Sequence, residues 1–571
     1  MSKTRTEKIS TGEGPSVFII GAGIGGITMG LDLDSRGITN WMMFERSDGI
    51  GGTWHANRYP GCRCDVPAIV YSHSKHPNPN WTQTHPERAE IQKYWENLAY
   101  SQGQKERIRL NQNIVDAKWD KTRKLYVVEV KDLVKDETYF VETDILVTAS
   151  GGLSQPKYID LPGEEGFKGQ VVHAGDWPRD LSVESLKGKK VVVVGNGCSG
   201  VQVVATLGED PEIEVVSLAR ARQWFVPSNP GEPRHSVPYS ETRNKLWRKF
   251  PFLMGAERFI MACIMDSLWY WYKEKEGKRA RTKLQASLLE WYKAELPEYM
   301  HDAIEPTHPF GSKRLIFEDG YFEALRKPNV KFVDGRIASL TEEKVIVDDG
   351  RELDADLVVL ATGYDADTTQ YQVHGSTDST ANYKSRSEYH TYRGISHPGI
   401  PNFFNVLGNN MGLNHMGITT VIEIQTAYIG QLVEQMRDNN IKELEVRKDA
   451  TFKYETWIEK RLNDTTWVQV NNWWRGNDGK GRLFTHYPGS VRRLWWEQHK
   501  PIYKDWIGAD AVVRKERLRR VVFVAALLAS GYFAKQHNFE YESMKDTIVG
   551  EAIKLVASAK VYLQSWTAKS S

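Results

Sequence analysis

The chain has 571 residues, too many for one hydrophobic core and typical of about three to four domain-sized units. Apolar residues make up 40% of the chain and charged residues 26%, which excludes a disordered or fibrous protein. The formal net charge is only +2, so nothing indicates a nucleic-acid partner, which usually needs a strongly basic domain.

The first informative element is a glycine loop near the N-terminus. Residues 16–20 form a short apolar run, the pattern of a strand buried in a parallel sheet, and lead into Gly21, Gly23 and Gly26. A GxGxxG loop before a helix lets the backbone approach a pyrophosphate and points helix amides at it. Glu45 follows the next predicted strand, close to the spacing of about 20 residues expected of a ribose-binding carboxylate. We therefore predict a dinucleotide site here.

A second glycine loop repeats the design. Residues 190–194 form another apolar run, which leads into Gly195, Gly197 and Gly200. After the next predicted strand the chain carries Arg220 where the first loop has its carboxylate. An arginine at this position suits the 2′-phosphate of NADP, and a solvated loop charge is the alternative.

The stretch from about residue 240 to 305 differs in kind. It carries many Trp, Phe and Tyr among Lys, Arg and Glu, with few glycines, and predicts helices inserted into the second α/β unit. Lys313 and Arg314 follow it, and residues 355–360 form a third apolar run before Ala361-Thr362-Gly363. Strands alternating with helices at these intervals predict an α/β architecture.

Several motifs together resemble one enzyme family. The segment 167–178 lies between the glycine loops, and its Phe, Gly and His, closed by Trp177-Pro178, resemble the fingerprint of the type I Baeyer–Villiger monooxygenases. Residues 51–65, a dense run of Gly, Pro and aromatic residues, resemble the family's second flavin-binding signature, and residues 361–365 and 401–404 resemble further motifs. The matches run in the family's order over most of the first 420 residues or so, and the layout is similar to the longer fungal members.

The resemblance implies an α/β fold with two Rossmann-like dinucleotide-binding domains, one for FAD and one for NADP. The expected FAD-binding parts are residues 1–155 and 386–571, the second with a C-terminal helical region. The expected NADP-binding parts are residues 156–235 and 311–385. The helical insertion in the NADP domain is expected at residues 236–310.

The resemblance also implies a set of cofactor contacts. The residues expected to bind FAD or NADPH are Gly21, Gly23, Gly26, Glu45, Gly52, Thr53, Trp54, Tyr59, Asp65, Gly195, Gly197, Gly200, Arg220, Lys313 and Trp473. Lys313 is expected to reach the 2′-phosphate beside Arg220, and Trp473 to belong to a mobile loop over NADP. His173 is expected to transmit motion between domains and not to transfer protons.

Arg314 and Asp65 are the expected catalytic pair. In the family a Lys-Arg pair after the helical insertion supplies a fixed cation, and Lys313-Arg314 stands in that place. The guanidinium would stabilise negative charge during oxygen transfer with little reorganisation, and Asp65 would orient it. A dibasic pair on the surface is the alternative.

The implied function is an NADPH-consuming, FAD-dependent monooxygenase that inserts one atom of O2 next to a ketone carbonyl to give an ester or lactone. The aromatic insertion and tail predict a bulky apolar substrate, such as a polyketide, steroid or terpenoid ketone of secondary metabolism. The alternatives are an N- or S-hydroxylating flavin monooxygenase, a disulfide or quinone reductase, and a nucleotide-binding protein without turnover. A reductase would need a redox-active cysteine pair, and Cys62 and Cys64 have the wrong spacing.

The remaining expectations concern metals, compartment and membranes. Four cysteines are too few and too poorly spaced for a disulfide framework or a zinc site, and the polar N-terminus shows no secretory signal, so we expect no metal and a cytoplasmic location. Residues 521–534 form an apolar run after the basic stretch 514–520. The run is short for a membrane span and predicts a buried helix, with a membrane-surface contact through residues 514–534 as the alternative. The oligomeric state stays open.

Overall fold

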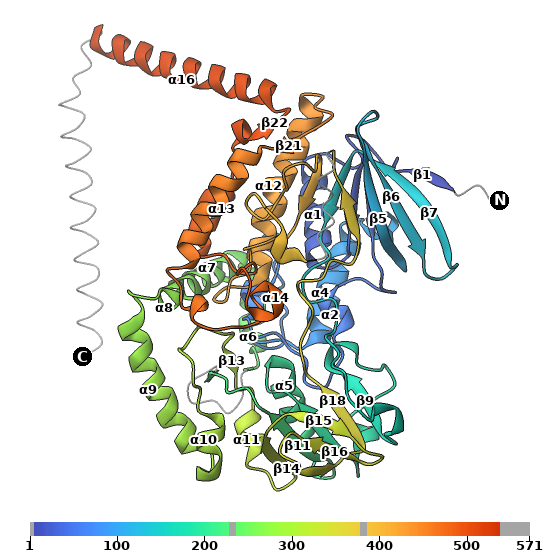
Figure 1. Ribbon diagram of the computed structural model, residues 1–571. Helices are drawn as coiled ribbons and strands as arrows, with labels where there is room; N and C mark the ends of the chain where they lie inside the picture. The colour runs from blue at the N-terminus through green and yellow to red at the C-terminus, as the bar shows by residue number, and fades with distance from the viewer. Residues whose placement is uncertain (1–4, 228–235, 377–384, 537–571) are drawn as a thin grey trace. The chain divides into compact units, whose positions relative to one another are not determined.

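A computed structural model describes residues 5–227, 236–376 and 385–536. The chain divides into two compact units, Met1–Gly508 and Ala509–Ser571. All sheets of the described residues belong to the first unit, whose elements are labelled in Figure 1.

The first glycine loop follows strand β2 of a five-stranded parallel sheet, whose strand order is β20-β8-β2-β3-β4. Its strands are β2 Val17–Ile20, β3 Trp41–Phe44, β4 Ile108–Arg109, β8 Ile145–Thr148 and β20 Phe403–Asn405. Every residue of β2, β3 and β8 is buried, so these strands are continuous apolar runs instead of alternating ones. The last strand enters from residue 403, which means that the chain leaves this sheet and later returns to it.

The second glycine loop follows strand β10 of another five-stranded parallel sheet, whose strand order is β14-β11-β10-β18-β9. Its strands are β9 Gln170–His173, β10 Lys190–Val194, β11 Glu214–Ala219, β14 Val330–Asp334 and β18 Leu357–Leu360. Helix α5 (Cys198–Leu207) follows the loop and packs against β10 and β11. Two parallel sheets, each with a glycine loop, confirm the predicted α/β class.

An antiparallel meander, which the sequence did not predict, packs on the first sheet. Its strands are β5 Gln112–Asp120, β6 Leu125–Asp132 and β7 Glu137–Thr143. Tyr126 and Val128 of β6 share a core with Phe18 and Phe44 of the first sheet. Buried and partly exposed residues alternate along β6, so only one face of this strand packs on the core.

The predicted helical insertion is present. Its helices are α6 Glu241–Lys249, α7 Pro251–Ser267, α8 Trp269–Tyr272, α9 Lys278–Glu295 and α10 His301–Ile304 (Figure 1). The Ser240 hydroxyl accepts a hydrogen bond from Arg243 N at 3.2 Å and caps the first of them. Trp269 and Tyr272 join Trp467 and Trp474 in an aromatic core, so the insertion packs against the C-terminal part of the first unit.

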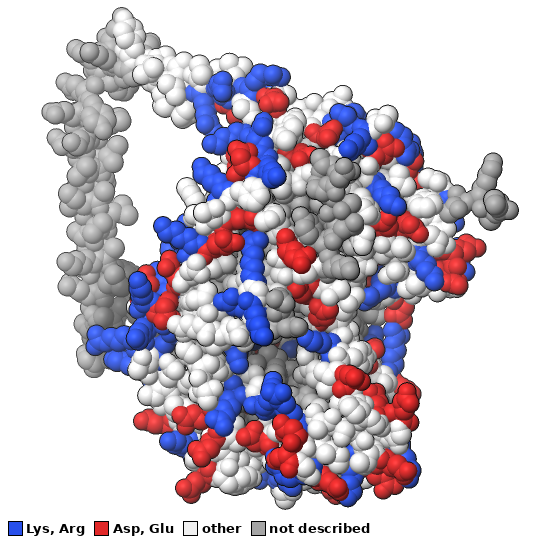
Figure 2. Space-filling model, in the orientation of Figure 1, with Lys and Arg blue, Asp and Glu red and all other residues white. Residues whose placement is uncertain are grey.

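Helices dominate the rest of the first unit. They are α1 Ile24–Ser35 after the first loop, α12 Ile418–Asp438, α13 Lys448–Leu462 and α15 Val491–Gln498. α1 and α12 pack against each other beside the first sheet (Figure 1). Figure 2 shows Lys and Arg mixed with Asp and Glu over the visible face, without a large field of one sign, as the small net charge indicates.

The second unit contains α16 (Asp510–Gln536), and here the prediction of a buried helix was wrong. Phe523 is 65% exposed and Leu528 is 70% exposed, and the neighbouring valines are similar. An apolar run predicts burial only if another segment packs against it. Within the described part of the second unit, α16 has no such segment. The end of the predicted C-terminal helical region, residues 537–571, and residues 228–235 and 377–384 of the predicted NADP-binding parts lie outside the described residues. Among the described helices, none is both long and apolar enough to cross a membrane.

Candidate functional site

The first glycine loop has the geometry that its sequence predicts. Gly21 has a φ of +97°, a conformation that favours glycine, and α1 begins three residues later. A Cβ on Gly26 would collide with the carbonyl oxygen of Gly21, so the third glycine lets the helix pack closely on the loop. The loop can therefore bring backbone amides against a phosphate.

Glu45 lies at the end of β3 and closes this loop. Its carboxylate accepts hydrogen bonds from Ala22 N and Ser47 N, both at 2.8 Å, and the residue is only 9% exposed. The two bonds hold the side chain beside the glycine loop, where a ribose hydroxyl would reach it.

The segment 51–65 lies over the same loop. Gly52 has a φ of +55° and begins the short helix α2 (Thr53–Ala56), and its hypothetical Cβ would lie 2.9 Å from the Gly23 Cα. The two backbones can approach this closely because both residues are glycine. Trp54 donates to the Tyr71 hydroxyl at 3.1 Å, and the Tyr59 hydroxyl donates to Gln202 of α5 at 3.0 Å. The segment thus bridges the surroundings of the two glycine loops.

A cavity of ≈ 600 Å³ opens beside the first glycine loop. The predicted site residues that line it are Gly21, Gly23, Glu45, Gly52, Thr53, Trp54, Tyr59, Asp65, Arg314 and Trp473. These residues come from distant parts of the chain, and the fold brings them to one cavity. Gly26, Gly195, Gly197, Gly200, Arg220 and Lys313 are not among its lining residues.

Arg314 and Asp65 form an ion pair in the wall of this cavity. The guanidinium donates to the Asp65 carboxylate and, at 3.3 Å, to the carbonyl oxygen of Asn414. Burial alone would lower the pKa of Arg314, but the nearby Asp65 outweighs it and raises that pKa further. Arg314 is therefore a fixed cation, and about a third of its side chain is exposed. The alternative of a surface dibasic pair does not describe this residue.

A group of polar and aromatic residues near Arg314 escaped the sequence prediction. His486 Nε2 donates to Asn414 Oδ1 at 2.8 Å, and Thr485 Oγ1 lies 2.6 Å from His486 Nδ1. Burial, together with the positive charge of Arg314, lowers the pKa of His486 to about 3, so its imidazole is neutral. The rings of His486 and Trp474 lie 4.2 Å apart between centroids. These side chains stand a hundred or more residues from Arg314 in the sequence, and no local motif links them to it.

The Asn414 side chain is distinctive within this group. It lines the cavity, and its buried Nδ2 amide has no hydrogen-bond partner among the described residues. Buried amides are rarely left without an acceptor. This donor therefore fits a carbonyl or similar oxygen of a bound molecule.

The second glycine loop has the same backbone but different surroundings. Gly195 has a φ of +107°, and a Cβ on Gly200 would collide with the Gly195 carbonyl oxygen. Arg220 follows β11 and is exposed. Lys313 is half-buried, and burial lowers its pKa. Within the described part of the chain no contact joins Lys313 to Arg220, so their joint phosphate site stays a prediction.

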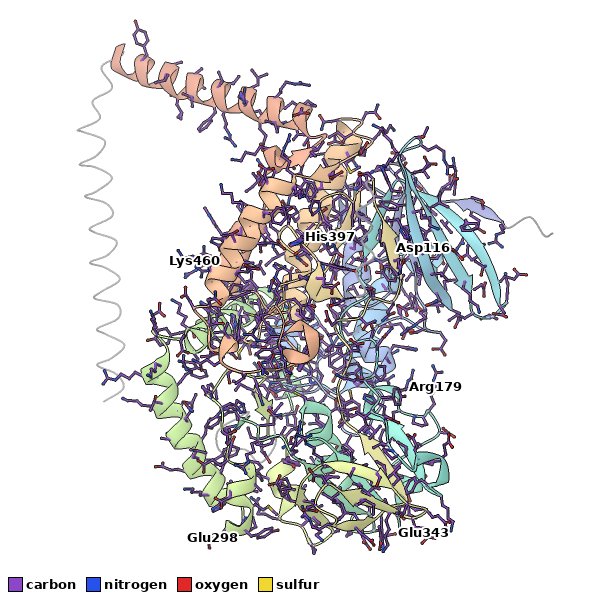
Figure 3. All side chains as sticks on the ribbon, viewed as in Figure 1. Asp116, Arg179, Glu298, Glu343, His397 and Lys460 are labelled. Atoms are coloured by element: carbon purple, nitrogen blue, oxygen red, sulfur yellow. The ribbon has the colours of Figure 1, made fainter. Side chains whose placement is uncertain are left out.

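The segment around His173 connects the two halves. His173 ends β9, its Nδ1 accepts from Gly175 N at 2.9 Å, and burial lowers its pKa. The residue is buried and lies outside the cavity wall, as a structural role requires. Beyond Trp177, Arg179 (labelled in Figure 3) donates to Asp48 at 2.6 Å and ties this segment to the first domain.

Trp473 lies at the mouth of the cavity. It is 53% exposed and lines the cavity, and its neighbour Asn472 donates to Ser312 O at 3.3 Å. The segment that carries Trp473 therefore contacts the residue just before Lys313 and Arg314.

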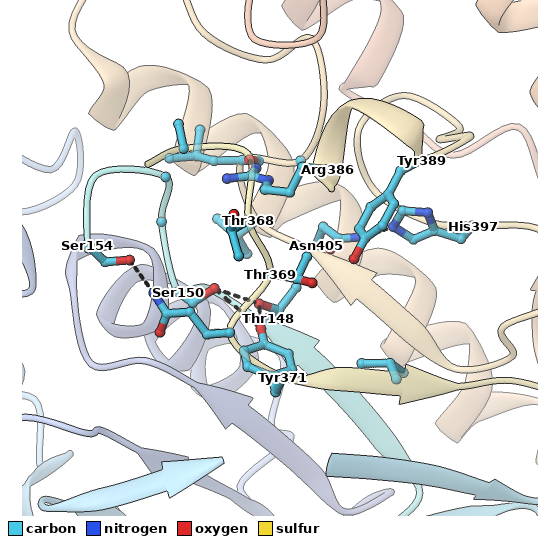
Figure 4. Close-up of a pocket in the computed structure, with 18 of the residues that line it drawn as sticks. Thr148, Ser150, Ser154, Thr368, Thr369, Tyr371, Arg386, Tyr389, His397 and Asn405 are labelled. Atoms are coloured by element: carbon cyan, nitrogen blue, oxygen red, sulfur yellow. Dashed lines mark hydrogen bonds between the residues drawn. The ribbon is translucent and has the colours of Figure 1, made fainter. Parts of the chain in front are cut away.

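A smaller pocket of ≈ 70 Å³ adjoins the large cavity (Figure 4). The two share Ser150, Tyr371 and Arg386 as lining residues. Ser150 Oγ lies 3.3 Å from the Tyr371 hydroxyl, and Arg386 donates to Leu407 O at 3.0 Å. The cavity thus extends into a polar recess with a second guanidinium.

Among the described residues, neither a redox-active cysteine pair nor a metal-binding cluster is present. Burial raises the pKa of Cys62 to about 12 and that of Cys64 well above its ordinary value, so neither thiolate is favoured. Cys62, Cys64, Cys198 and Cys263 are all free thiols. Within the described ranges, no cluster of three or more His, Cys, Asp or Glu could hold a metal ion.

Comparison of sequences points to one group of enzymes. Residues 15–234 match the family described as Pyridine nucleotide-disulphide oxidoreductase. The chain is 29% identical over 488 residues to a Baeyer-Villiger monooxygenase of Pseudomonas aeruginosa, covering 84% of this chain and 88% of the relative. It is 28% identical over 523 residues to an FAD-binding monooxygenase of Aspergillus niger, covering 88% of this chain and 83% of that protein.

Comparison of structures agrees on the fold. A cyclohexanone monooxygenase from Rhodococcus sp. Phi1, solved with NADP+, superposes with a TM-score of 0.72 at 22% identity, covering 86% of this chain and 97% of that one. An oxidized steroid monooxygenase bound to NADP superposes with the same TM-score and identity, covering 87% and 99%. The motifs, the cavity and these relatives agree: the chain is similar to the type I Baeyer–Villiger monooxygenases, and it is an NADPH-dependent flavin monooxygenase of Baeyer–Villiger type.

Proposed function

We propose that this enzyme inserts one oxygen atom of O2 next to the carbonyl of a bulky apolar ketone and releases an ester or lactone. The observation that carries the proposal is the Arg314–Asp65 ion pair in the wall of the cavity that the first glycine loop opens into. The NADPH-binding residues, the substrate class and the role of each side chain are parts of this proposal.

The residues of the first loop fit FAD. Gly21, Gly23 and Gly52 form a cradle that side chains would fill, and Glu45 stands where ribose hydroxyls would reach it. The remaining proposed contacts are Gly26, Thr53, Trp54, Tyr59 and Asp65. When bound, FAD accepts electrons from NADPH and passes one atom of O2 to the substrate. The proposed FAD-binding parts are residues 1–155 and 386–571.

The second loop fits NADPH. Gly195, Gly197 and Gly200 would hold the pyrophosphate, and Arg220 with Lys313 would contact the 2′-phosphate. The proposed NADP-binding parts are residues 156–235 and 311–385, with the insertion at 236–310. Trp473, exposed at the cavity mouth, would cover the nicotinamide end from its loop, and His173 would transmit movement between the two domains.

The positive charge of Arg314 stabilises the negative charge that develops on oxygen during the reaction. Its permanent cation costs no reorganisation when charge develops on oxygen, and Asp65 keeps the guanidinium in place. The free Nδ2 amide of Asn414, held beside Arg314, would donate a hydrogen bond to the ketone carbonyl oxygen. His486 is neutral, so it fixes Asn414 without adding a second positive charge.

The lining supports an apolar substrate. Aromatic and aliphatic residues face the cavity near Arg314, among them Trp474, Phe484 and Leu413. Such a wall favours a large apolar ketone, since each buried CH2 contributes roughly 0.8 kcal/mol. Polyketide, steroid or terpenoid ketones have this character.

The decisive experiment is product analysis. The purified enzyme would be incubated with NADPH, O2 and a panel of cyclic, steroidal and short linear ketones, with one thioether. Esters or lactones 16 mass units heavier than the ketone, formed most rapidly from the bulky members, are expected. Sulfoxide without any ester would favour a heteroatom-oxidising enzyme, and conversion of short linear ketones alone would overturn the substrate class.

Arg314→Ala tests the role of the cation. We expect ester formation to fall by about 10²–10³-fold, the usual effect of removing one charge-stabilising donor, while FAD binding and NADPH oxidation persist. Arg314→Lys should recover part of the activity because it keeps the charge. Ester formation at the wild-type rate in Arg314→Ala would contradict the assignment.

A further inference from the structure

Each of the three charged residues of helix α7, in the insertion, contacts another part of the protein. Glu257 pairs with Arg243 of α6. Arg258 donates to Ile69 O at 2.7 Å and to Ser72 O at 2.8 Å. Asp266 accepts from Val491 N at 2.6 Å. All the charged side chains of this helix are therefore engaged with the protein, the reverse of an ordinary surface helix.

The outer side of α7 is apolar. Phe252 and Phe259 are each 69% exposed, Ile260 is 59% exposed and Ile264 is 53% exposed. The other exposed residues of this helix are Pro251, Leu253, Gly255, Ala256, Cys263 and Ser267, so none of its exposed residues is charged. A contiguous apolar face of this kind marks a site of interaction.

Helix α15 (Val491–Gln498) carries two exposed tryptophans, and its first residue is hydrogen-bonded to α7. Asp266 accepts the hydrogen bond of Val491, the first residue of α15. Trp495 of α15 is 50% exposed and Trp496 is 71% exposed. Tryptophan prefers the boundary between an apolar layer and water, because its ring is apolar and its N–H is polar.

The flanks of the apolar face are basic. Helix α6, directly before α7, has the sequence ETRNKLWRK, in which Lys and Arg far outnumber the single acid, and Lys245 and Lys249 are exposed. Arg492 and Arg493 are exposed at the start of α15. Two copies of this chain that met through these surfaces in a symmetric dimer would bring the basic flanks together, which is unfavourable. Phosphate groups of anionic lipids would complement them.

We propose that the outer face of α7, with Trp495 and Trp496, is a docking surface for an anionic lipid bilayer. The apolar side chains would enter the boundary between headgroups and acyl chains, and the lysines and arginines would meet lipid phosphates. Helix α16 offers a second element of the same composition, since its basic residues 514–520 precede the exposed apolar run from Val521. The proposal does not depend on which ketone the enzyme oxidises.

Vesicle flotation of the full-length flavoprotein tests the surface. Wild-type protein is expected to float with vesicles of phosphatidylcholine and phosphatidylserine, to float less with phosphatidylcholine alone, and to be released by high salt. Phe259→Glu/Ile260→Glu should reduce the floated fraction about tenfold, because two charges would enter the apolar layer. Val134→Glu, which changes an equally exposed apolar residue in the β6–β7 turn, is the matched control and should float like wild type.

Further variants separate the outcomes. Phe523→Glu/Leu527→Glu in α16 should weaken flotation but leave a part that Phe259→Glu/Ile260→Glu removes. Activity with a water-soluble ketone should stay at the wild-type level in every variant, which separates lost docking from misfolding. Wild-type protein that does not float, or an α7 variant that floats unchanged, would overturn the proposal. So would a wild-type dimer that the α7 variant makes monomeric while vesicles bind neither protein.

Discussion

The two glycine loops share one backbone design but lie in different surroundings. Both first glycines have positive φ values, +97° for Gly21 and +107° for Gly195, and both third glycines press against the carbonyl oxygen of the first. The first loop faces Gly52 of the covering segment, and its partner Glu45 is 9% exposed. A Cβ on Gly197, in the second loop, would meet nothing within 4 Å, and its partner Arg220 is exposed.

This difference fits two cofactors that stay bound to the protein for different lengths of time. A nucleotide held under a covering segment, with its ribose partner fixed by two backbone amides, would stay with the protein through many turnovers. A nucleotide recognised by an exposed arginine would exchange in each turnover. The glycine motifs themselves are the same in both loops, and the difference in enclosure appears only in the structure.

The largest contrast is expected from the matched pair Gly26→Ala and Gly200→Ala. In each, the new Cβ collides with the carbonyl oxygen of the first glycine of its loop. Gly26→Ala should yield protein without bound flavin, seen as loss of absorbance at about 450 nm, and hence without activity. Gly200→Ala should keep its flavin and lose only rapid reduction by NADPH. Loss of flavin from both variants would show that the loops are not independent.

Arg220→Ala tests the open loop. Removal of a charge-assisted contact costs about 1.5–3 kcal/mol, so the KM for NADPH should rise about 10–100-fold with little change in kcat. The KM for NADH, which lacks the 2′-phosphate, should not change. Arg222→Ala is the control two residues along the chain. Equal effects on NADPH and NADH would refute phosphate recognition by Arg220.

Glu45→Gln tests the enclosed loop. The substitution keeps one acceptor but places an amide N–H against a backbone N–H, which should weaken flavin retention by about tenfold, or roughly 1.4 kcal/mol. Flavin release during dialysis measures it. Unchanged flavin retention would mean that Glu45 only accepts the hydrogen bonds of Ala22 and Ser47 and does not contact the flavin nucleotide. Arg220→Ala should retain its flavin fully under the same conditions.

The last prediction concerns acid stability near Arg314 and not cofactor binding. The pKa of His486 is lowered to about 3 in the folded protein, below its ordinary value of 6.5, so the unfolded chain binds this proton more readily. Stability from this residue is complete above pH 6.5 and falls as the pH drops from about 6.5 toward 3, by up to about 1.4 kcal/mol per pH unit. His486→Gln should therefore show a shallower fall in apparent Tm between pH 7.5 and 5. His499→Gln, at an exposed position, should follow wild type.

Much of the α/β framework could be predicted from the sequence. The strand at residues 41–44 coincides with its apolar run, and the strand at 190–194 begins one residue before its run of four valines, since strands buried on both faces need continuous apolar residues. The meander was missed because its strands alternate, and α16 was wrongly predicted to be buried because an apolar run does not specify its partner.

The candidate site was predicted only where local chemistry marks it. Arg314 and Asp65 were found through motifs in their own segments, and the structure joins them across 249 residues of chain. Asn414 and His486 carry no such signal, and their importance comes from their position beside Arg314. The exposed face of α7 likewise became visible only when the partners of Glu257, Arg258 and Asp266 were known.

The sequence by itself determined the glycine loops, their strands and the choice between carboxylate and arginine after them. These features depend on steric and periodic demands that act within a few residues. The tertiary structure alone decided which loop is enclosed, which side chains meet at Arg314 and which face of α7 turns outward. Those outcomes depend on packing between segments hundreds of residues apart, for which no local pattern exists.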